Sequence, residues 1–394
     1  MLGALTHACA LAALAYAART SSARRGWVRI PALSGATEAP ALSIVVPARN
    51  EERSIERCVR SLLAQTLAEY EVIVVDDRSD DRTGAILAAL AAADPRLRVV
   101  HGDALPAGWV GKPWALAQGA RAARGEWLLF TDADTQHAPQ AAASAMGFAR
   151  ARGADALTIW THQELGSWGE RAVLPTILGL IVLFAGTMAE VNDPADPEHA
   201  LANGQFVLVS RAAHVALGGF EALRAEIVED IAFARRLKAD GRFRLIVADG
   251  SDLVRVRMYA SLRELWDGFT KNVYAGARGD VLALAGAASG AALLSAVPLA
   301  LALEAAVRRK PLRALEALLC IGTAIAAQRV GLRATGMPAR LAWYAPVGFA
   351  VFGAIVVNST LRVVSGCGVG WRGRRYSGRP AAEAPAGRGG TSGE

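Results

Sequence analysis

The stretch that decides the fold is Glu71-Val-Ile-Val-Val-Asp-Asp-Arg-Ser-Asp-Asp81, a β-branched run that ends in an acidic cluster. A run of this kind favours a β-strand. Similar runs at 42–47 and 126–130 also lead into polar clusters. Apolar residues at helical spacing occupy three intervening segments, 53–65, 83–93 and 114–124. Strands that alternate with helices predict an α/β fold with a mostly parallel sheet, in which ligands bind beyond the carboxyl ends of the strands.

The composition indicates a chain in contact with a membrane. Its 394 residues are 53% hydrophobic and only 20% charged, and the formal net charge is +7. This apolar content excludes a disordered or collagen-like chain. Because the arginines flank apolar runs, the positive charge predicts contact with anionic lipid rather than with nucleic acid. The cysteines show no metal-ligand or disulfide spacing, so free thiols are expected at Cys9, Cys58, Cys320 and Cys367.

Apolar segments predict an N-terminal anchor and C-terminal transmembrane helices. Residues 1–18 are apolar and precede a basic stretch, which is typical of an uncleaved anchor with its basic flank in the cytoplasm. Residues 281–303 and 341–361 are uncharged and long enough to cross about 30 Å of hydrocarbon as helices. Residues 314–328 are a third candidate. The composition of residues 380–394 predicts a disordered tail.

Residues 172–189 form an apolar segment of a different kind. Pro175 and two glycines interrupt it, and candidate site motifs lie on both sides of it. A single membrane crossing there would divide one site between two faces of the bilayer, so we expect this segment to lie in the membrane interface. Basic stretches within and after the predicted membrane region, 281–364, leave the number of spans at three or four.

Two acidic pairs lie where neighbouring strands are predicted to end. Asp132 and Asp134 follow one strand, and Asp76 and Asp77 follow another. Taken alone, each pair is equally typical of turn and helix-capping residues. Carboxylates gathered in one crevice need a cation or a hydrogen-bonding ligand, and hard divalent cations prefer oxygen ligands. The two pairs together therefore predict a ligand site at this edge of the sheet.

An ordered set of motifs over residues 42–280 resembles the inverting glycosyltransferases of family 2, which have the GT-A fold. The set comprises Pro47 to Glu52, Val75 to Thr83, Phe130 to Asp134, Gly218-Gly219-Phe220 and Glu229-Asp230. A narrower similarity, to the membrane-attached carotenoid (diaponeurosporenoate-type) and hopanoid-associated branch, is carried by Leu105 to Ala115, Arg257-Met258-Tyr259 and Trp371 to Arg374. The Gln-x-x-Arg-Trp motif of the processive synthases is missing from the sequence.

The resemblance implies a Rossmann-like domain that binds a nucleotide sugar, and it assigns roles to individual residues. Donor-binding roles fall on Pro47, Arg49, Glu51, Asp76, Asp77, Lys112 and Asp132. The residues themselves add Gly204 and Gln205 as contacts to the donor sugar and Arg257 as a candidate phosphate clamp. Asp132 and Asp134 would hold Mg²⁺ or Mn²⁺ at the donor diphosphate, where a metal ion acts as a Lewis acid on the leaving group. From the residues alone, a solvated lysine at 112, a plain turn at 204–205 and a solvated face around Arg257 stay open.

Glu229 and Asp230 are the candidate catalytic residues. They open a segment with helical apolar spacing, where carboxylates also interact favourably with the helix dipole. Displacement of a nucleoside diphosphate by a hydroxyl needs a base within hydrogen-bond reach of that hydroxyl. The resemblance places Asp230 in this role with Glu229 beside it, and crowding of like charges would raise one of the two pKa values.

Together these expectations describe a metal-dependent hexosyltransferase that moves one sugar from a nucleotide-sugar donor, such as a UDP-sugar, to an apolar membrane lipid. A carotenoid, a hopanoid and a polyprenyl phosphate are the acceptor types considered. The chain is expected to be a multi-pass protein of the inner membrane with a cytoplasmic catalytic domain and no nucleic-acid partner. A processive polysaccharide synthase and a non-enzymatic membrane scaffold are the alternatives. The missing motif counts against the first, and the complete acidic set counts against the second.

Overall fold

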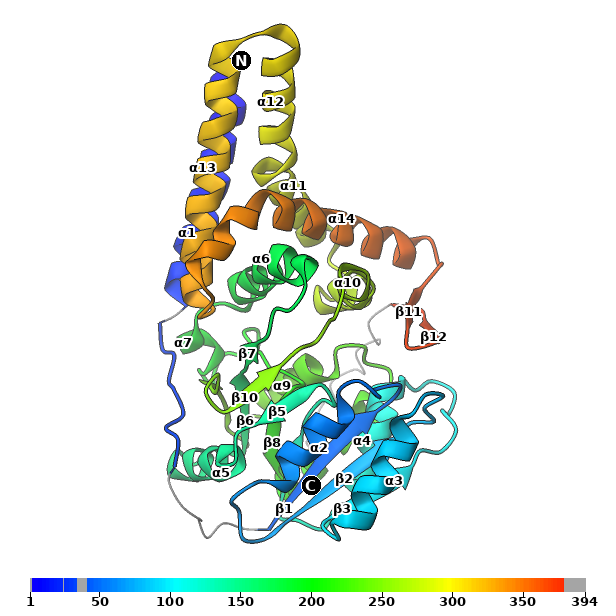
Figure 1. The fold of residues 1–394 in the computed structure, drawn as a ribbon. Helices are drawn as coiled ribbons and strands as arrows, with labels where there is room; N and C mark the ends of the chain where they lie inside the picture. Colours follow the sequence, from blue (N-terminus) through cyan, green and yellow to red (C-terminus); the bar gives the residue numbers. More distant parts are fainter. Residues whose placement is uncertain (1, 24, 34–40, 379–394) are drawn as a thin grey trace, which may run out of the picture.

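A seven-stranded sheet forms the centre of the soluble part of the molecule (Figure 1), with the strand order β3-β2-β1-β4-β8-β6-β9. This computed structural model describes residues 2–23, 25–33 and 41–378. The strands are β1 (Leu42–Ala48), β2 (Tyr70–Asp76), β3 (Leu97–His101), β4 (Trp127–Phe130), β6 (Ala156–Trp160), β8 (Val207–Ser210) and β9 (Leu245–Asp249). Only β8 runs antiparallel to its neighbours β4 and β6, while the other pairs are parallel. The predicted mostly parallel sheet is confirmed.

Helices cover both faces of this sheet because successive strand residues point to opposite sides. Ile44 and Val46 pack on one side in a core with α2 (Ile55–Leu63), α3 (Thr83–Ala93) and α5 (Ala141–Ala151). Val45 and Ile73 pack on the other side with α4 (Gly111–Ala122) and α9 (Glu229–Asp240). The short helices α8 (Arg211–Ala216) and η1 (Gly219–Leu223) complete this second layer. The three helices expected from apolar spacing correspond to α2, α3 and α4.

A small second sheet links the main sheet to the helices above it. Its strand order is β5-β10-β7, with β5 (Thr135–His137), β10 (Val254–Val256) and β7 (His162–Gln163). The strand β5 follows directly after the Asp132-Ala133-Asp134 segment, and β10 leads into α10 (Leu262–Gly276). Pairing of β5 with β10 therefore places the acidic motif next to the segment that leads into α10.

A layer of helices lies across the carboxyl ends of the strands (Figure 1). It contains α6 (Trp168–Ala185), α10 and α14 (Ala345–Val364), and these helices share one apolar core. The short helix α7 (Met188–Val191) follows α6, and η2 (Ala339–Tyr344) precedes α14. Residues 172–189, predicted to lie in the membrane interface, fall mainly on α6, which lies between the sheet domain and α14 (Figure 1). Residues 341–361, predicted as a transmembrane helix, fall on η2 and α14 in this same layer.

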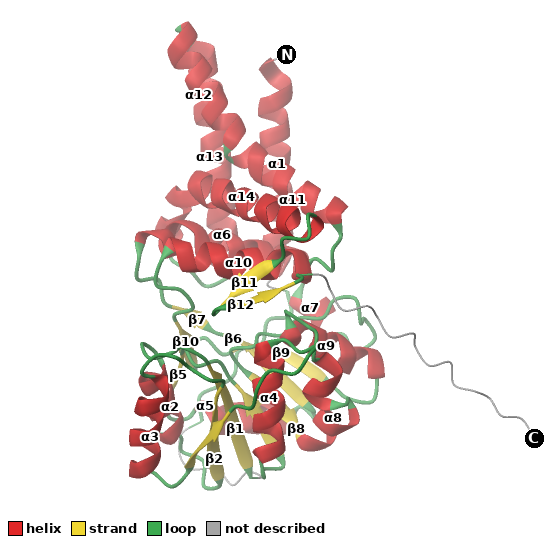
Figure 2. Ribbon diagram, turned by 90° about the vertical axis from the view of Figure 1, so that its right-hand side faces the viewer, coloured by secondary structure: helices red, strands yellow, loops and turns green. Residues whose placement is uncertain are grey.

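Further helices extend away from the sheet domain (Figure 2). The predicted anchor forms most of α1 (Leu2–Ala23), which packs along α13 (Pro311–Ala334). The segment predicted at 281–303 is broken at Ser295 into α11 (Val281–Leu294) and α12 (Ala296–Arg308), and 314–328 lies within α13. Among the described residues, four helical segments are long and apolar enough to cross a membrane: 168–185, 281–308, 311–334 and 339–364. The predicted tail, 380–394, lies outside the described residues.

Candidate active site

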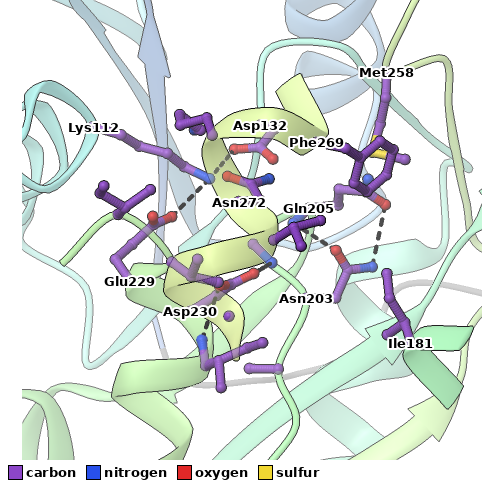
Figure 3. A pocket seen from close by; sticks show the side chains of 18 of the residues that line it. Lys112, Asp132, Ile181, Asn203, Gln205, Glu229, Asp230, Met258, Phe269 and Asn272 are labelled. Carbon is purple, nitrogen blue, oxygen red and sulfur yellow. Dashed lines mark hydrogen bonds and ion pairs between the residues drawn. The ribbon is translucent and has the colours of Figure 1, made fainter. Parts of the chain in front are cut away.

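A cavity of about 600 Å³ lies between the carboxyl ends of β1, β2 and β4 and the overlying helices. Its lining includes residues that precede α6, such as Asp132 and Gln163, and residues that follow it, such as Gly204 and Asp230. The Gln163 amide donates to the side-chain oxygen of Gln205 over 3.2 Å. The motifs on the two sides of α6 are thus brought together in one site, as Figure 3 shows for the residues around Asp230.

Two interlocked turns shape the part of the cavity at the ends of β1 and β2. Asn50 and Arg78 both adopt positive φ, and the Asn50 backbone N–H donates to Ser79 Oγ over 3.0 Å. The Arg49 guanidinium donates to the backbone carbonyls of Asp77 and Arg78, at 2.6 and 2.9 Å. These bonds fix the two loops against each other. Pro47, Arg49, Glu51 and Asp77 line the cavity there.

Asp76, predicted to bind the donor, is used differently. Its side chain accepts a hydrogen bond from the Ser79 backbone N–H over 3.1 Å, and it is not among the cavity-lining residues. Asp76 therefore stabilises the turn that presents Asp77.

The Asp132-Ala133-Asp134 segment places two carboxylates in the cavity. Asp132 accepts from the Lys112 ammonium over 2.7 Å. Asp134 Oδ1 is buried and has no hydrogen-bond partner, and burial followed by the charge of Asp132 raises the pKa of Asp134 well above its usual range. An unpartnered carboxylate oxygen beside a second carboxylate suits a cation that takes its remaining ligands from a diphosphate. Within the described residues, no three or more His, Cys, Asp or Glu side chains lie close enough together to hold a metal ion by themselves.

Lys112, in the first turn of α4, connects the two acidic parts of the site. Its Nζ atom lies 2.7 Å from Asp132 Oδ1 and 2.7 Å from Glu229 Oε1 (Figure 3). Burial lowers the pKa of Lys112, but Asp132, Glu229 and Asp230 raise it more, so its pKa lies well above the usual value. The ammonium is therefore a fixed positive charge in the cavity, and the alternative of a solvated loop lysine does not hold.

Glu229 and Asp230 begin α9 and line the cavity, and Asp230 Oδ1 also accepts from the Ile231 backbone N–H in the first turn over 2.8 Å. Asp230 Oδ2 accepts from the Gly204 backbone N–H over 2.7 Å, and a Cβ atom at Gly204 would come within 2.8 Å of Lys112 Nζ. Burial, and after it the charge of Glu229, raises the pKa of Asp230 to about 6. A carboxylate with this pKa is ionised near neutral pH and can still accept a proton, which is what a general base requires.

Gln205 and Arg257 are both held by neighbouring side chains. The Gln205 side-chain oxygen accepts from Thr161, Gln163 and Asn203, so it organises the wall beside Gly204. The Arg257 guanidinium donates to the Glu170 carboxylate over 3.1 and 3.2 Å and lies outside the cavity lining. Because Glu170 stands in the first turn of α6, this ion pair attaches α6 to the sheet domain, and we do not retain Arg257 as a phosphate clamp.

Several residues that line the cavity were given no role by the sequence analysis. Lys271 and Asn272 come from α10, and burial lowers the pKa of Lys271 to about 8. Arg372 and Arg374 come from the hairpin of β11 (Val369–Trp371) and β12 (Arg374–Tyr376). A lysine inside an amphipathic helix has no local signal that points to this cavity, and the motif that contains Arg372 and Arg374 does not indicate which loops it contacts. Only the fold brings them there.

The far end of the same cavity is apolar. Its lining includes Ile177, Ile181 and Phe184 from α6, and Phe352 and Val356 from α14. Leu284 and Ala287 add the start of α11. The cavity thus has a charged part at the strand ends and an apolar part between the helices of the overlying layer.

Comparisons with known proteins agree with the class of fold. Residues 43–213 match the family model of glycosyl transferase family 2. Over 241 residues, 60% of this chain and 62% of the relative, the chain is 27% identical to 4,4'-diaponeurosporenoate glycosyltransferase of Staphylococcus haemolyticus. It is also 42% identical over 95 residues to the uncharacterized glycosyltransferase EpsJ of Bacillus subtilis, covering 24% of this chain and 26% of EpsJ. The chain thus spans about three fifths of the first relative and about a quarter of the second.

The structural comparison concerns the fold. A mannosyltransferase from Pyrobaculum calidifontis, solved with GDP-Man and Mn²⁺, superposes with a TM-score of 0.55 and 18% identity, covering 92% of this chain and 98% of that one. The sheet domain therefore has a GT-A-like fold, and residues 43–213 within it match the model of glycosyl transferase family 2.

Proposed function

We propose that this protein is an inverting glycosyltransferase that moves a single hexose from a nucleotide-sugar donor to an apolar lipid of the membrane. The observation that carries the proposal is the single cavity with a charged end and an apolar end. Asp230 lines it with Asp77 and Asp132 as well as with Ile181 and Phe352. An acceptor whose hydroxyl is attached to a long apolar body would fit this division, with the hydroxyl toward Asp230.

The charged end suits a nucleoside diphosphate sugar. Asp77 and Glu51 offer oxygen acceptors to a nucleoside, and Lys112 and Lys271 offer positive charge to a diphosphate. Asp132 and Asp134 would hold Mg²⁺ or Mn²⁺, which supplies charge stabilisation to the leaving diphosphate when bound. UDP is the nucleotide that the family resemblance favours for the donor.

The base is Asp230. Its carboxylate takes the proton of the acceptor hydroxyl while the hydroxyl oxygen attacks the anomeric carbon from the face opposite the diphosphate. The new glycosidic bond forms as the bond to the diphosphate breaks, so the configuration at that carbon inverts. The Gly204 N–H, which donates to Asp230 Oδ2, keeps the carboxylate oriented for this transfer.

The membrane arrangement proposed here is a multi-pass protein of the inner membrane with the sheet domain in the cytoplasm. The four apolar helical segments and the basic residues that follow α1 support it. The names of the staphylococcal relatives support a carotenoid-like acceptor, and a hopanoid or polyprenyl phosphate has the same division into polar head and apolar body.

The test is a transfer assay with membranes that contain the full-length protein. Radiolabelled UDP-sugars and GDP-sugars are supplied with a total lipid extract, and the product is separated into organic and aqueous fractions. We expect label in an organic-soluble product that carries one sugar, and about 100-fold less of it, or lower still, with Asp230→Asn. Asp193→Asn, on an exposed loop carboxylate, is the matched control and should retain activity. Label in an aqueous polymer would support a processive synthase, and no transfer with any donor would support a scaffold.

A further inference from the structure

The hairpin β11–β12 comes after the overlying helical layer in the chain and returns to the cavity. It follows α14, more than 150 residues after the segment that matches the family model. Figure 2 shows β11 and β12 between the helical layer and the sheet domain. Trp371 of the hairpin contacts α10, because Lys271 Nζ lies 5.1 Å from the centre of its ring. This cation–π contact attaches the hairpin beside the catalytic cavity.

The two hairpin arginines contact the loops expected to bind the nucleoside. Arg374 forms a two-pronged ion pair with Asp77, with Nη2 lying 3.0 Å from Asp77 Oδ1. Arg372 Nη2 lies 2.6 Å from Glu51 Oε1, and its Nη1 donates to the Asn50 carbonyl over 2.9 Å. In return, Arg49 Nε donates to the Arg372 carbonyl over 3.1 Å. The hairpin is therefore bonded to both strand-end loops at the nucleotide end of the cavity.

The start of α4 is shaped to admit Arg374. A Cβ atom at Gly111 would overlap the Arg374 guanidinium, so any other residue there would displace it. The Asp77 side chain is only 5% exposed, and a carboxylate buried to this extent without a cation is costly. Each carboxylate oxygen can accept more than one hydrogen bond, so the ion pair leaves Asp77 able to accept from a nucleoside N–H or hydroxyl.

We propose that the hairpin β11–β12 completes the donor site, with Arg374 and Arg372 acting as positioning residues that orient Asp77 and Glu51 toward the nucleoside of a nucleoside diphosphate sugar. The proposal rests on the proposed function, because it needs a nucleotide at this end of the cavity. It goes further by assigning part of the donor site to residues outside the family-matched segment. The transferase domain alone would then bind its donor poorly.

The test compares Arg374→Ala with Arg375→Ala in the full-length protein, using UDP and GDP binding and steady-state kinetics. Arg375 is the matched control, because it is the next residue of the same strand, is exposed and does not line the cavity. For Arg374→Ala, we expect the nucleotide Kd and the donor KM to rise about 10- to 100-fold, while kcat at saturating donor changes little. Arg374→Lys should recover only part of the loss, because an ammonium cannot form the two-pronged pair.

A double substitution separates positioning from general damage. In an Asp77→Ala background, Arg374→Ala should add little further loss, because its effect passes through Asp77. Equal nucleotide binding by the wild type and Arg374→Ala would overturn the hairpin proposal while leaving the proposed function intact. Tighter binding by Arg374→Ala would overturn it as well, because the hairpin would then obstruct Asp77. A wild-type protein that binds no nucleotide would overturn both proposals.

Discussion

The charged and apolar ends of the cavity are built in different ways. The charged end takes most of its residues from short motifs at the ends of β1, β2 and β4 and at the start of α9. The apolar end takes its residues from α6, α11 and α14, which lie far apart in the chain and carry no motif. Chemistry that depends on a few polar atoms constrains residue type and spacing, whereas an apolar wall needs only apolar side chains of suitable volume. The first end is therefore recognisable from sequence and the second only from the fold.

The largest expected effect lies at the charged end and concerns the metal. We expect EDTA to reduce donor turnover by at least about 10³-fold and Mn²⁺ or Mg²⁺ to restore it, because charge stabilisation by a metal ion contributes several kcal/mol to such reactions. Asp134→Asn should weaken the restoration and raise the metal concentration required. Turnover is measured as nucleoside diphosphate release. Full activity in chelator would leave Asp132 and Asp134 without a metal role.

Asp230→Asn tests the proposed base, which lies where the charged and apolar ends of the cavity meet. We expect kcat to fall by about 10² or more, the range for loss of a general base, with nucleotide binding close to wild type. Equilibrium binding of UDP or GDP is the control. A parallel loss of binding and kcat would instead assign Asp230 to the donor end.

The pH profile of the wild type sharpens the same prediction. The base acts in its ionised form, and the pKa of Asp230 is raised to about 6. The value of kcat/KM should therefore fall about tenfold per pH unit below about 6 and level off above it. Asp230→Asn should lose this acidic limb, and a variant that keeps it would assign the titration to another group.

The difference between the charged and apolar ends of the cavity also explains which site residues the sequence could predict. The strand and helix positions over 42–130 and the cavity positions of Asp77, Asp132 and Asp230 could be read from motifs. The roles of Asp76 and Arg257 could not, because an acidic or basic residue beside a motif looks the same whether it faces the cavity or a neighbouring loop. Arg374 belongs to a family-like motif, but its pairing with Asp77 depends on a contact across 297 positions of sequence.

A smaller effect is expected at the apolar end. Ile181→Asn places an amide in the cavity wall of α6, and we expect the acceptor KM to rise about tenfold with the donor KM unchanged. Leu183→Asn, two residues along the same helix and outside the cavity lining, is the matched control. If both variants lost activity equally, the effect would be one of helix stability. If neither changed the acceptor KM, this wall would not contact the acceptor.

The last prediction concerns topology rather than rate, namely the side of the membrane on which the segments that form the cavity lie. Because residues on both sides of α6 share one cavity, and because the hairpin β11–β12 contacts Asp77, residues 162, 193 and 375 must all lie on one face. The chain between α10 and β11 then crosses the bilayer an even number of times, although it contains three segments long and apolar enough to cross. In Figure 1, α12 and α13 extend away from the domain while α14 lies across it, so α14 is the segment expected not to cross.

Cysteine labelling in sealed vesicles checks this arrangement. In a Cys367→Ser background, which removes the exposed native thiol, an impermeant reagent should label His162→Cys, Asp193→Cys and Arg375→Cys from the same side. Lys310→Cys, in the turn between α12 and α13, should be labelled only from the other side. The basic charge of that turn is partly offset, because Glu304 lies within ion-pair distance of Lys310 and Arg313. Labelling of Asp193→Cys and Arg375→Cys from opposite faces would mean that α14 crosses the bilayer, and the hairpin could not then reach the donor site.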